Sequence, residues 1–284
     1  MVGNNLKRLE YVDAAKGLGI LLMVLGHIWI NACAEIVIWI YSFHMPMFFL
    51  LSGIILRYTK IMDKKSLAEI IRKKFRQLIV PYIVFEFIYV ILIGSLHQFD
   101  YEILQWRWYD GLFFLPVNGP LWFLLCLFLI ECVFVCLHTF VKNNKFLLFF
   151  TIILYLVPFI LISENPQIKF LMICCTAYGF LSLGYYLFDY IRDKQLSWFK
   201  ITFLLFIGAI LALVNTKTNM YELNYKNPFL YSINGVITSF TFIFIFKRVK
   251  IKFLIFWGKN TILMLSLHIL CISIISKIKS YCNL

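Results

Sequence analysis

The sequence predicts an all-α fold, a polytopic bundle of transmembrane helices that forms one domain over residues 1–284. The chain is 62% hydrophobic and only 14% charged, and its mean hydropathy is +0.85, whereas soluble domains are much more polar. Its apolar runs have the lengths of membrane-spanning helices. They are also continuous, while a strand of a membrane barrel alternates polar and apolar residues. We therefore expect an integral membrane protein.

Nine apolar runs have roughly the 17–25 residues that a helix needs to cross a bilayer, and a tenth span is possible. They lie near 14–33, 36–56, 78–96, 120–138, 146–162, 170–188, 199–214, 228–246 and 260–276. The segment before the first run contains Lys7, Arg8, Glu10 and Asp13, which is too charged for a simple signal peptide. We therefore expect the first run to remain as a permanent helix.

The distribution of positive charge predicts the orientation of the chain. With the amino terminus inside, 21 of the 27 Lys and Arg residues fall on one side of the membrane and six on the other. Cytoplasmic loops are rich in these residues, so we expect a multi-pass protein of the bacterial cytoplasmic membrane with its amino terminus in the cytoplasm. The net charge of +13 lies in short segments beside anionic membrane lipid, so nucleic acid is not an expected partner.

The eight cysteines do not suggest a metal centre. Seven of them fall in or at the edge of apolar runs, and none has the Cys-x-x-Cys spacing of a zinc site. We interpret them as small packing groups and predict no metal.

Two ionisable residues share one face of the first span. Lys16 and His27 are eleven residues apart, which returns the helix to within roughly 20° of its starting direction about 16 Å further along the axis. His44 lies in the next span, where an antiparallel hairpin would bring it to the depth of His27. Because ionisable groups are costly in lipid, they usually mark a functional site. We predict that the two imidazoles share one pocket.

The segment 57–77 carries eight Lys and Arg residues against Asp63 and Glu69. Within it, Lys73 and Arg76 stand just before Pro81-Tyr82, where the third span begins. Such a pair can hold phosphates by charge-assisted hydrogen bonds. It can equally serve only to fix the topology.

The outward loop 97–119 is rich in acidic and aromatic residues, including His97, Asp100, Trp106 and Trp108. One interpretation makes it the wall that meets a hydroxylated acceptor. The other treats its Trp and Tyr residues as anchors at the membrane surface.

Five segments, taken in order, form a recognisable set. They are residues 8–17 leading to Val24-Leu25-Gly26-His27, Phe43-His44-Met45-Pro46 through Ser52-Gly53, Lys73-x-x-Arg76 with Pro81-Tyr82, Gly119-Pro120-Leu121-Trp122-Phe123-Leu124, and Trp257-Gly258-Lys259-Asn260-Thr261 through Leu267-His268. The set resembles the acyltransferase 3 family of integral membrane proteins, and the resemblance runs along most of the chain. Lys16 stands where many members of this family carry Arg.

The resemblance implies a membrane O-acyltransferase. Members of the family move acyl groups, commonly acetyl, from coenzyme A to cell-surface sugars and related acceptors. We therefore expect acetyl-CoA as the acyl donor and a carbohydrate or glycolipid hydroxyl as the acceptor. Family members usually have ten spans with both termini inside, and this chain has no room for a complete tenth helix after His268. Either that helix is missing or a re-entrant hairpin lies around 97–119.

The chemistry that acyl transfer needs, applied to these motifs, indicates His27, His44 and Asp13 as the catalytic residues. His27 is the expected general base, because an imidazole with an unperturbed pKa near 6.5 suits proton abstraction. His44 is expected to bond the acyl carbonyl or His27, or else only to satisfy a kink at Pro46. Asp13 lies roughly 21 Å from His27 along the helix. We expect it to pair with Lys16 at i, i+3, either to position that residue or merely as a helix-start ion pair.

The remaining assignments concern binding. Lys16, Lys73 and Arg76 are expected to hold the coenzyme A phosphates, whereas Trp122 and Ser52 are candidates for substrate binding. Trp122 is expected to pack or to flank the acceptor, and Ser52 is expected to bond the backbone of its own helix in preference to the substrate. Three further residues lie in apolar runs. Glu86 and Glu131 are expected to be protonated, paired or in contact with water, and the role of His268 stays open.

Two other functions are compatible with these residues. A transporter or flippase with proton-relay histidines would explain the polytopic form, although it predicts paired inverted repeats, which the two halves of the sequence do not show. An assembly protein that has lost its activity is the other, but the presence of His27 and His44 together with the basic pair argues against it.

Overall fold

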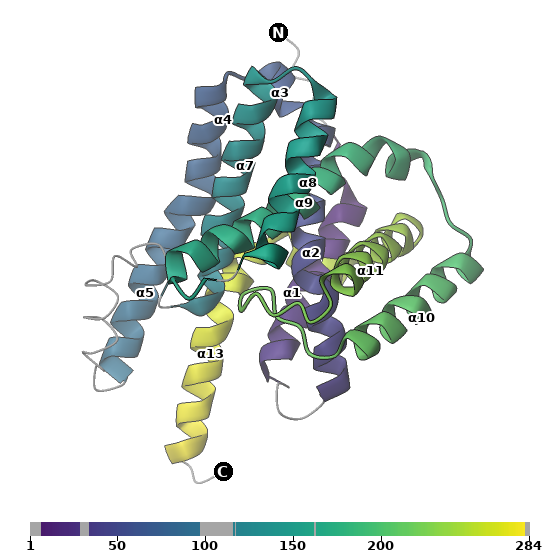
Figure 1. Ribbon diagram of the computed structural model, residues 1–284. Helices are drawn as coiled ribbons and strands as arrows, with labels where there is room; N and C mark the ends of the chain where they lie inside the picture. Colours follow the sequence, from purple (N-terminus) through teal and green to yellow (C-terminus); the bar gives the residue numbers. More distant parts are fainter. Residues whose placement is uncertain (1–6, 29–33, 97–115, 117, 162, 282–284) are drawn as a thin grey trace.

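The computed structural model describes residues 7–28, 34–96, 116, 118–161 and 163–281. These residues form a helical bundle without a β-strand, which confirms the predicted fold class (Figure 1). In chain order the elements are α1 (Glu10–Ile28), α2 (Ala34–Thr59), α3 (Ile61–Lys64), α4 (Leu67–Lys74), the π-helix η1 (Phe75–Ile79), α5 (Val80–Leu96), the 3₁₀-helix η2 (Gly119–Leu121), α7 (Trp122–Phe140), α8 (Asn144–Ile160), α9 (Pro166–Asp193), α10 (Trp198–Asn215), α11 (Pro228–Arg248), α12 (Lys252–Lys259) and α13 (Thr261–Tyr281).

Each of the nine predicted runs overlaps one of these helices. Seven of the described helical segments are long and apolar enough to cross a membrane, and α8 is a shorter apolar helix. The ninth run corresponds to α13, which follows α12 after a bend of 84° at Asn260. The protein is thus a multi-pass membrane protein. The first helix begins at Glu10 instead of near residue 14, so Asp13 and Lys16 belong to its first turns.

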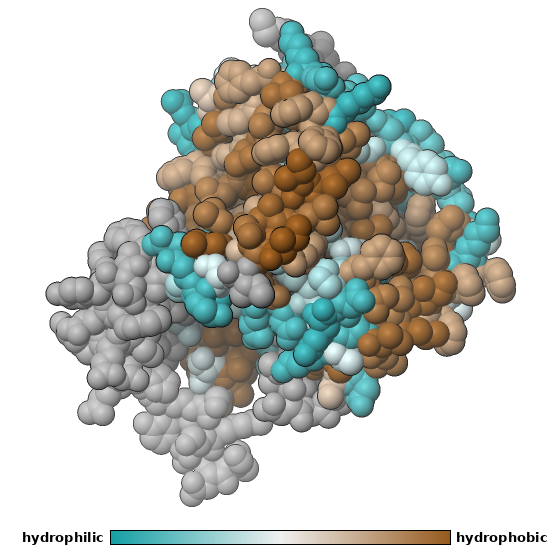
Figure 2. Space-filling model, in the orientation of Figure 1, coloured by the Kyte–Doolittle hydropathy of each residue, from teal (hydrophilic) through white to brown (hydrophobic). Residues whose placement is uncertain are grey.

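The outer surface has the polarity expected of a protein in lipid. Figure 2 shows broad hydrophobic areas on the visible face, with hydrophilic residues gathered at the upper edge and in a band between these areas. Large apolar side chains of α8 and α10 are exposed, among them Phe149 (62%), Phe199 (81%) and Phe206 (64%). Continuous exposed apolar surface of this kind faces hydrocarbon in membrane proteins, whereas soluble monomers keep such patches small.

Four consecutive helices begin on a side chain that caps the first turn. Asn143, Asn165, Ser197 and Asn227 accept hydrogen bonds from backbone N–H groups at the starts of α8, α9, α10 and α11. Such caps satisfy N–H groups that have no partner inside the helix. In α9 and α11 a proline follows the cap, at the position where a missing N–H does no harm.

Glycines bring two pairs of helices into backbone contact. A Cβ atom added at Gly53 of α2 would lie 1.9 Å from the Leu181 carbonyl oxygen of α9, and one added at Gly258 of α12 would lie 1.7 Å from the Asp13 carbonyl oxygen of α1. Only glycine permits such an approach, and small residues mark helix contacts in membranes for this reason. The second contact fixes α12 against the beginning of α1, and α13 starts from there.

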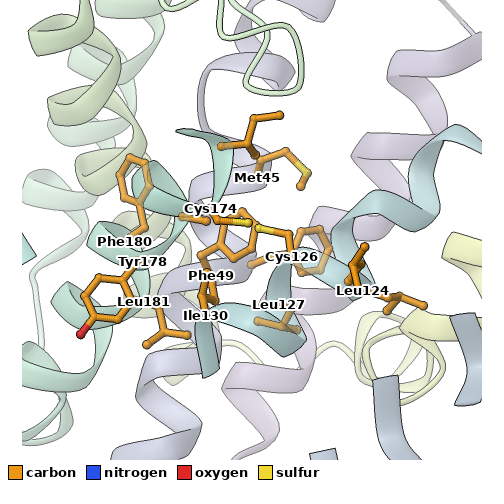
Figure 3. Close-up of a cluster of buried hydrophobic side chains, with 14 of the residues drawn as sticks. Met45, Phe49, Leu124, Cys126, Leu127, Ile130, Cys174, Tyr178, Phe180 and Leu181 are labelled. Carbon is orange, nitrogen blue, oxygen red and sulfur yellow. The ribbon is translucent and has the colours of Figure 1, made fainter. Parts of the chain in front are cut away.

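The centre of the bundle is a dense apolar cluster where α2, α7 and α9 meet. Figure 3 shows Cys126 of α7 and Cys174 of α9 pointing toward each other beside Phe49 of α2. Both cysteines are buried, and none of the six cysteines in the described residues forms a disulfide. Packing is thus the observed role of this pair.

Candidate active site

His27 and His44 line the same cavity, which has a volume of about 290 Å³. It lies between α1, α2, the start of α7, α13 and the loop 216–227. The predicted pocket with two imidazoles is therefore present in the geometry. The lining residues are Met23, His27, Tyr41, His44, Met45, Gly119, Pro120, Trp122, Phe123, Asn219, Met220, Tyr221, Glu222 and Leu265.

His44 has a fixed orientation and a defined free nitrogen. The residue is 5% exposed, and its Nδ1 lies 2.8 Å from the Ile40 carbonyl oxygen. Because a carbonyl only accepts, Nδ1 carries the hydrogen and neutral His44 keeps its lone pair on Nε2. Pro46 has no N–H, so the carbonyl of Ser42, four residues earlier, is the one that lacks its helical donor. The His44 ring bonds the carbonyl of Ile40 and not that of Ser42. Kink repair therefore does not explain this histidine.

His27 lies in the last turn of α1 and is partly buried. Its ring packs edge-on to Tyr41, with 6.4 Å between the ring centroids. Within the described part of the chain, no hydrogen bond occupies either ring nitrogen of His27.

A third histidine reaches this place from the far end of the chain. The ring of His268 in α13 lies 5.2 Å from that of His27, and the residue is 5% exposed. Its Nδ1 lies 2.9 Å from the Leu265 carbonyl oxygen and 3.1 Å from that of Met264. Sequence reasoning found His268 in the closing motif, but nothing in the sequence indicated that it would contact His27.

The aromatic residues beside the cavity include the predicted Trp122, which is 7% exposed. Its ring lies 5.6 Å from that of Tyr221 at an angle of 33° between the ring planes. Trp122 thus both packs in the bundle and lines the cavity, so the two predicted roles are compatible.

The loop 216–227 was missed as part of the site. It contributes Asn219, Tyr221 and Glu222 to the cavity, and buried Asn215 holds its two ends together. The Nδ2 of Asn215 donates to the Tyr225 carbonyl (3.1 Å), and its Oδ1 accepts from the Asn227 N–H (2.9 Å). The available signal was the polar stretch between two apolar runs. The predicted acceptor wall 97–119 lies almost wholly outside the described residues, and His97, Asp100, Trp106 and Trp108 with it.

A smaller cavity of about 120 Å³ adjoins the first and is lined by Lys16, Ser52 and Thr261 among others. The two cavities have Met23, Met45, Phe123 and Leu265 in common. The Lys16 end of α1 and the histidine end thus open onto neighbouring spaces. Ser52 donates its hydroxyl to the Phe48 carbonyl at 3.0 Å, the backbone bond that was expected.

Asp13 does not pair with Lys16, which corrects that expectation. Arg8 takes both carboxylate oxygens of Asp13, with its Nε at 2.5 Å and its Nη2 at 3.0 Å. The physical reason is that a planar guanidinium offers two donors in a fork that matches a carboxylate better than an ammonium does. Asp13 lies at the opposite end of α1 from His27 and does not line the histidine cavity.

The basic segment has two cations at the surface, as predicted for Lys73 and Arg76, and a further cation that enters the bundle. Lys73 and Arg76 are exposed, whereas Lys74 reaches Glu131 of α7, with 2.8 Å between Nζ and Oε2. Glu131 is thus paired, one of the states expected for it. Lys74, Glu131, Arg8 and Asp13 all lie within electrostatic range of Lys16. The sequence shows Lys74 within a basic run, but only packing against α7 distinguishes it from its neighbours.

Glu86 also has a partner, since its carboxylate accepts a hydrogen bond of 3.2 Å from the backbone N–H of Asn118. Asn118 in turn donates its Nδ2 to the Ser266 carbonyl at 2.9 Å. This chain of bonds connects α5 and α13 just beside His268.

Metal ligands do not gather in the described ranges: no three His, Cys, Asp or Glu side chains there could share an ion.

The chain was compared with known proteins. The model of a protein family described as an acyltransferase domain matches residues 9–281, nearly the whole chain. The searches of curated proteins and of solved structures found no match.

Proposed function

Because the chain belongs to the acyltransferase 3 family, we propose that it is a membrane O-acetyltransferase that moves acetyl from cytoplasmic acetyl-CoA to a hydroxyl of a cell-surface glycan or glycolipid. The observation that carries this proposal is that His27 and His44 line one cavity. Acyl transfer to an alcohol needs a base at the hydroxyl and hydrogen-bond donors at the carbonyl oxygen. A cavity lined by two imidazoles meets the first need.

His27 is the proposed general base. One nitrogen of its neutral ring takes the proton of the acceptor hydroxyl while the oxygen attacks the thioester carbonyl. The tetrahedral intermediate then collapses, the carbon–sulfur bond breaks, and the coenzyme A thiolate takes the proton from His27. The histidine is thus neutral again, and the products are the acetyl ester and free coenzyme A.

His44 and Tyr41 would complete this pocket. Neutral His44 has only an acceptor at Nε2, since its Nδ1–H is bound to Ile40. It therefore suits the acceptor hydroxyl better than the acyl carbonyl, which requires a donor. Tyr41 lines the same cavity, and its ring lies 5.1 Å from that of His44. We assign its hydroxyl as the donor to the developing oxyanion.

The donor would enter from the side of Lys16. Lys16 lines the smaller cavity, and the cations Arg8 and Lys74 lie near it, so phosphates can be held there by charge-assisted hydrogen bonds. Lys73 and Arg76 would attract the nucleotide from the surface. The excess of Lys and Arg on their side supports a cytoplasmic position for the amino terminus and these cations. The pantetheine arm would then extend through the adjoining spaces toward His27.

The acceptor would enter from the loop 216–227. This loop and the start of α7 supply the neighbouring rings of Trp122 and Tyr221, and the same loop supplies Asn219 and Glu222. An apolar wall with a few directed polar groups is the usual composition of a small-molecule site. Hydroxyl groups of a sugar would bond the polar groups while its ring lies against the aromatic side chains.

The test is acetyl transfer by the purified full chain in lipid nanodiscs, given acetyl-CoA and an extract of cell-envelope glycans. Release of the coenzyme A thiol and acetylation of the glycan, measured by mass spectrometry, are expected for the unchanged chain. His27→Ala should lose both by about a hundredfold or more. His138→Ala is the matched control, because His138 bonds Phe134 and Tyr186 away from the cavity.

Two results would contradict the proposal. Undiminished transfer by His27→Ala would remove the proposed base. No thiol release by the unchanged chain, together with substrate movement across sealed vesicles, would favour a transporter.

A further inference from the structure

The two nitrogens of His268 have different surroundings. Its Nδ1 faces the carbonyl oxygens of Leu265 and Met264 at 2.9 and 3.1 Å. Carbonyl oxygens only accept, so Nδ1 holds the hydrogen and Nε2 holds the lone pair. Nε2 is buried and has no hydrogen-bond partner in the described part of the chain. A buried polar atom without a partner is unfavourable and calls for an explanation.

The neighbour that can satisfy this nitrogen is His27. The two ring centroids are 5.2 Å apart and the ring planes meet at 43°. Imidazoles at this separation are close enough for a ring N–H of His27 to reach Nε2 after a change in its side-chain torsion, or through one bridging water. No hydrogen bond among the described residues holds the His27 ring, which contacts only the rings of Tyr41 and His268 among the aromatic pairs there. Catalytic hydrogen bonds are often long before substrate binds.

His268 is held rigidly enough to direct such a bond. Its ring is fixed by two backbone carbonyls, and Asn118 anchors the same turn of α13 through the Ser266 carbonyl. His44 has the same arrangement, with Nδ1–H on a carbonyl. The His27 ring contacts two rings, that of His268 in α13 and that of Tyr41 in α2. His268, and not His44, is therefore the imidazole in ring contact with His27.

We propose that His268 is a positioning residue, whose Nε2 accepts the N–H of His27 and thereby directs the lone pair of the other His27 nitrogen into the cavity. This inference rests on the function proposed above. When His27 takes the hydroxyl proton, it becomes a cation with two N–H groups. His268 stabilises that cation through its lone pair and takes no proton itself. The proton leaves His27 with the coenzyme A thiolate.

The first test compares two substitutions of His268 in nanodiscs. His268→Phe keeps the ring volume and removes the acceptor, whereas His268→Gln keeps an acceptor oxygen near the place of Nε2. We expect His268→Phe to lower kcat about tenfold to a hundredfold, the effect of one hydrogen bond to a charged group, with the KM for acetyl-CoA within about twofold. His268→Gln should recover most of this loss. Equal losses in both variants, or none in His268→Phe, would overturn the inference.

The second test needs no acetyl transfer. Carbethoxylation of His27 by diethyl pyrocarbonate is followed by mass spectrometry, with His138 of the same chain as the internal reference. His27 should react several-fold more slowly in His268→Phe than in the unchanged chain and in His268→Gln, while the rate at His138 stays constant. An unchanged rate at His27 would overturn the inference whatever the activity. Slowed carbethoxylation in a chain that transfers no acetyl would support the positioning and reject the proposed function. If His268→Phe does not fold, His268→Leu takes its place in this test. Slowed carbethoxylation of His27 in His268→Leu would support the inference, and an unchanged rate would overturn it.

Discussion

The ammonium group of Lys74 lies 2.8 Å from the carboxylate of Glu131, and these two side chains are only 13% and 4% exposed. The pair joins α4 to α7 and lies within electrostatic range of Lys16. The basic segment thus has a structural role as well, since one of its cations enters the bundle and holds two helices together.

Glu131→Gln should destabilise the protein. The change leaves Lys74 buried without a counter-charge, and breaking one partner of a buried pair costs about 3–5 kcal/mol. The measurement is thermal unfolding in nanodiscs. Glu164→Gln is the control, because its ion pair with Lys169 at 2.6 Å is on the surface and should contribute nothing measurable. The double change Lys74→Met with Glu131→Leu should restore most of the stability. An unchanged unfolding temperature in Glu131→Gln would show that this pair is not a structural contact.

Gly53→Leu should separate α2 from α9. Even its Cβ would overlap the Leu181 carbonyl oxygen at 1.9 Å, so the helices must move apart. We expect a loss of about 3 kcal/mol, the upper end for overpacking, in thermal unfolding of the purified protein. A Cβ added at Gly119 meets no atom within 4 Å, so Gly119→Ala serves as the control. Equal unfolding temperatures for the two variants would contradict the close approach.

Lys16→Ala should weaken the binding of the acyl donor. Loss of one charge-assisted hydrogen bond to a phosphate corresponds to roughly a tenfold to hundredfold rise in the KM for acetyl-CoA, while kcat changes little. Steady-state kinetics against acetyl-CoA measures both. Lys16→Arg keeps the charge and should retain most of the affinity. If the loss appeared wholly in kcat, Lys16 would act in the reaction and not in donor binding.

Lys74 should affect the donor more than Lys73 does. Lys74 is close to Lys16 and partly buried, whereas Lys73 is exposed, and exposed charges are screened by salt. We expect Lys74→Met, tested with Glu131→Leu so that no carboxylate is left unpaired, to raise the KM for acetyl-CoA more than Lys73→Met at 0.15 M salt. The reverse order would favour Lys73 and Arg76 as the main phosphate-binding cations.

Tyr221→Ala should impair the acceptor and not the donor. Tyr221 lies beside Trp122 at the loop 216–227, away from Lys16 and the smaller cavity. We expect a rise of about tenfold in the KM for the glycan, which corresponds to a lost aromatic contact of about 1.4 kcal/mol. Tyr190→Ala, at a surface position that is 61% exposed, is the matched control. A rise in the KM for acetyl-CoA alone would place the acceptor elsewhere.

Much of this protein follows from its sequence. Hydropathy alone predicts the spans, because a bilayer has a fixed thickness and leaves no backbone group unpaired. The caps at Asn143, Asn165 and Asn227 start their helices by local bonds. The helical period places Lys16 and His27 on one face, and the motifs indicate the family.

The tertiary structure decided which groups meet. His268 contacts His27 from the other end of the chain, and Asp13 pairs with Arg8 instead of Lys16. Lys74, and not Lys73, pairs with Glu131, and the loop 216–227 lines the cavity. A helical period fixes the direction of a side chain within its own helix only. In a membrane, lipid is as apolar as the side chains, so hydropathy does not determine how helices are placed against each other. Close packing at residues such as Gly53 and Gly258 decides that, and it depends on the whole bundle.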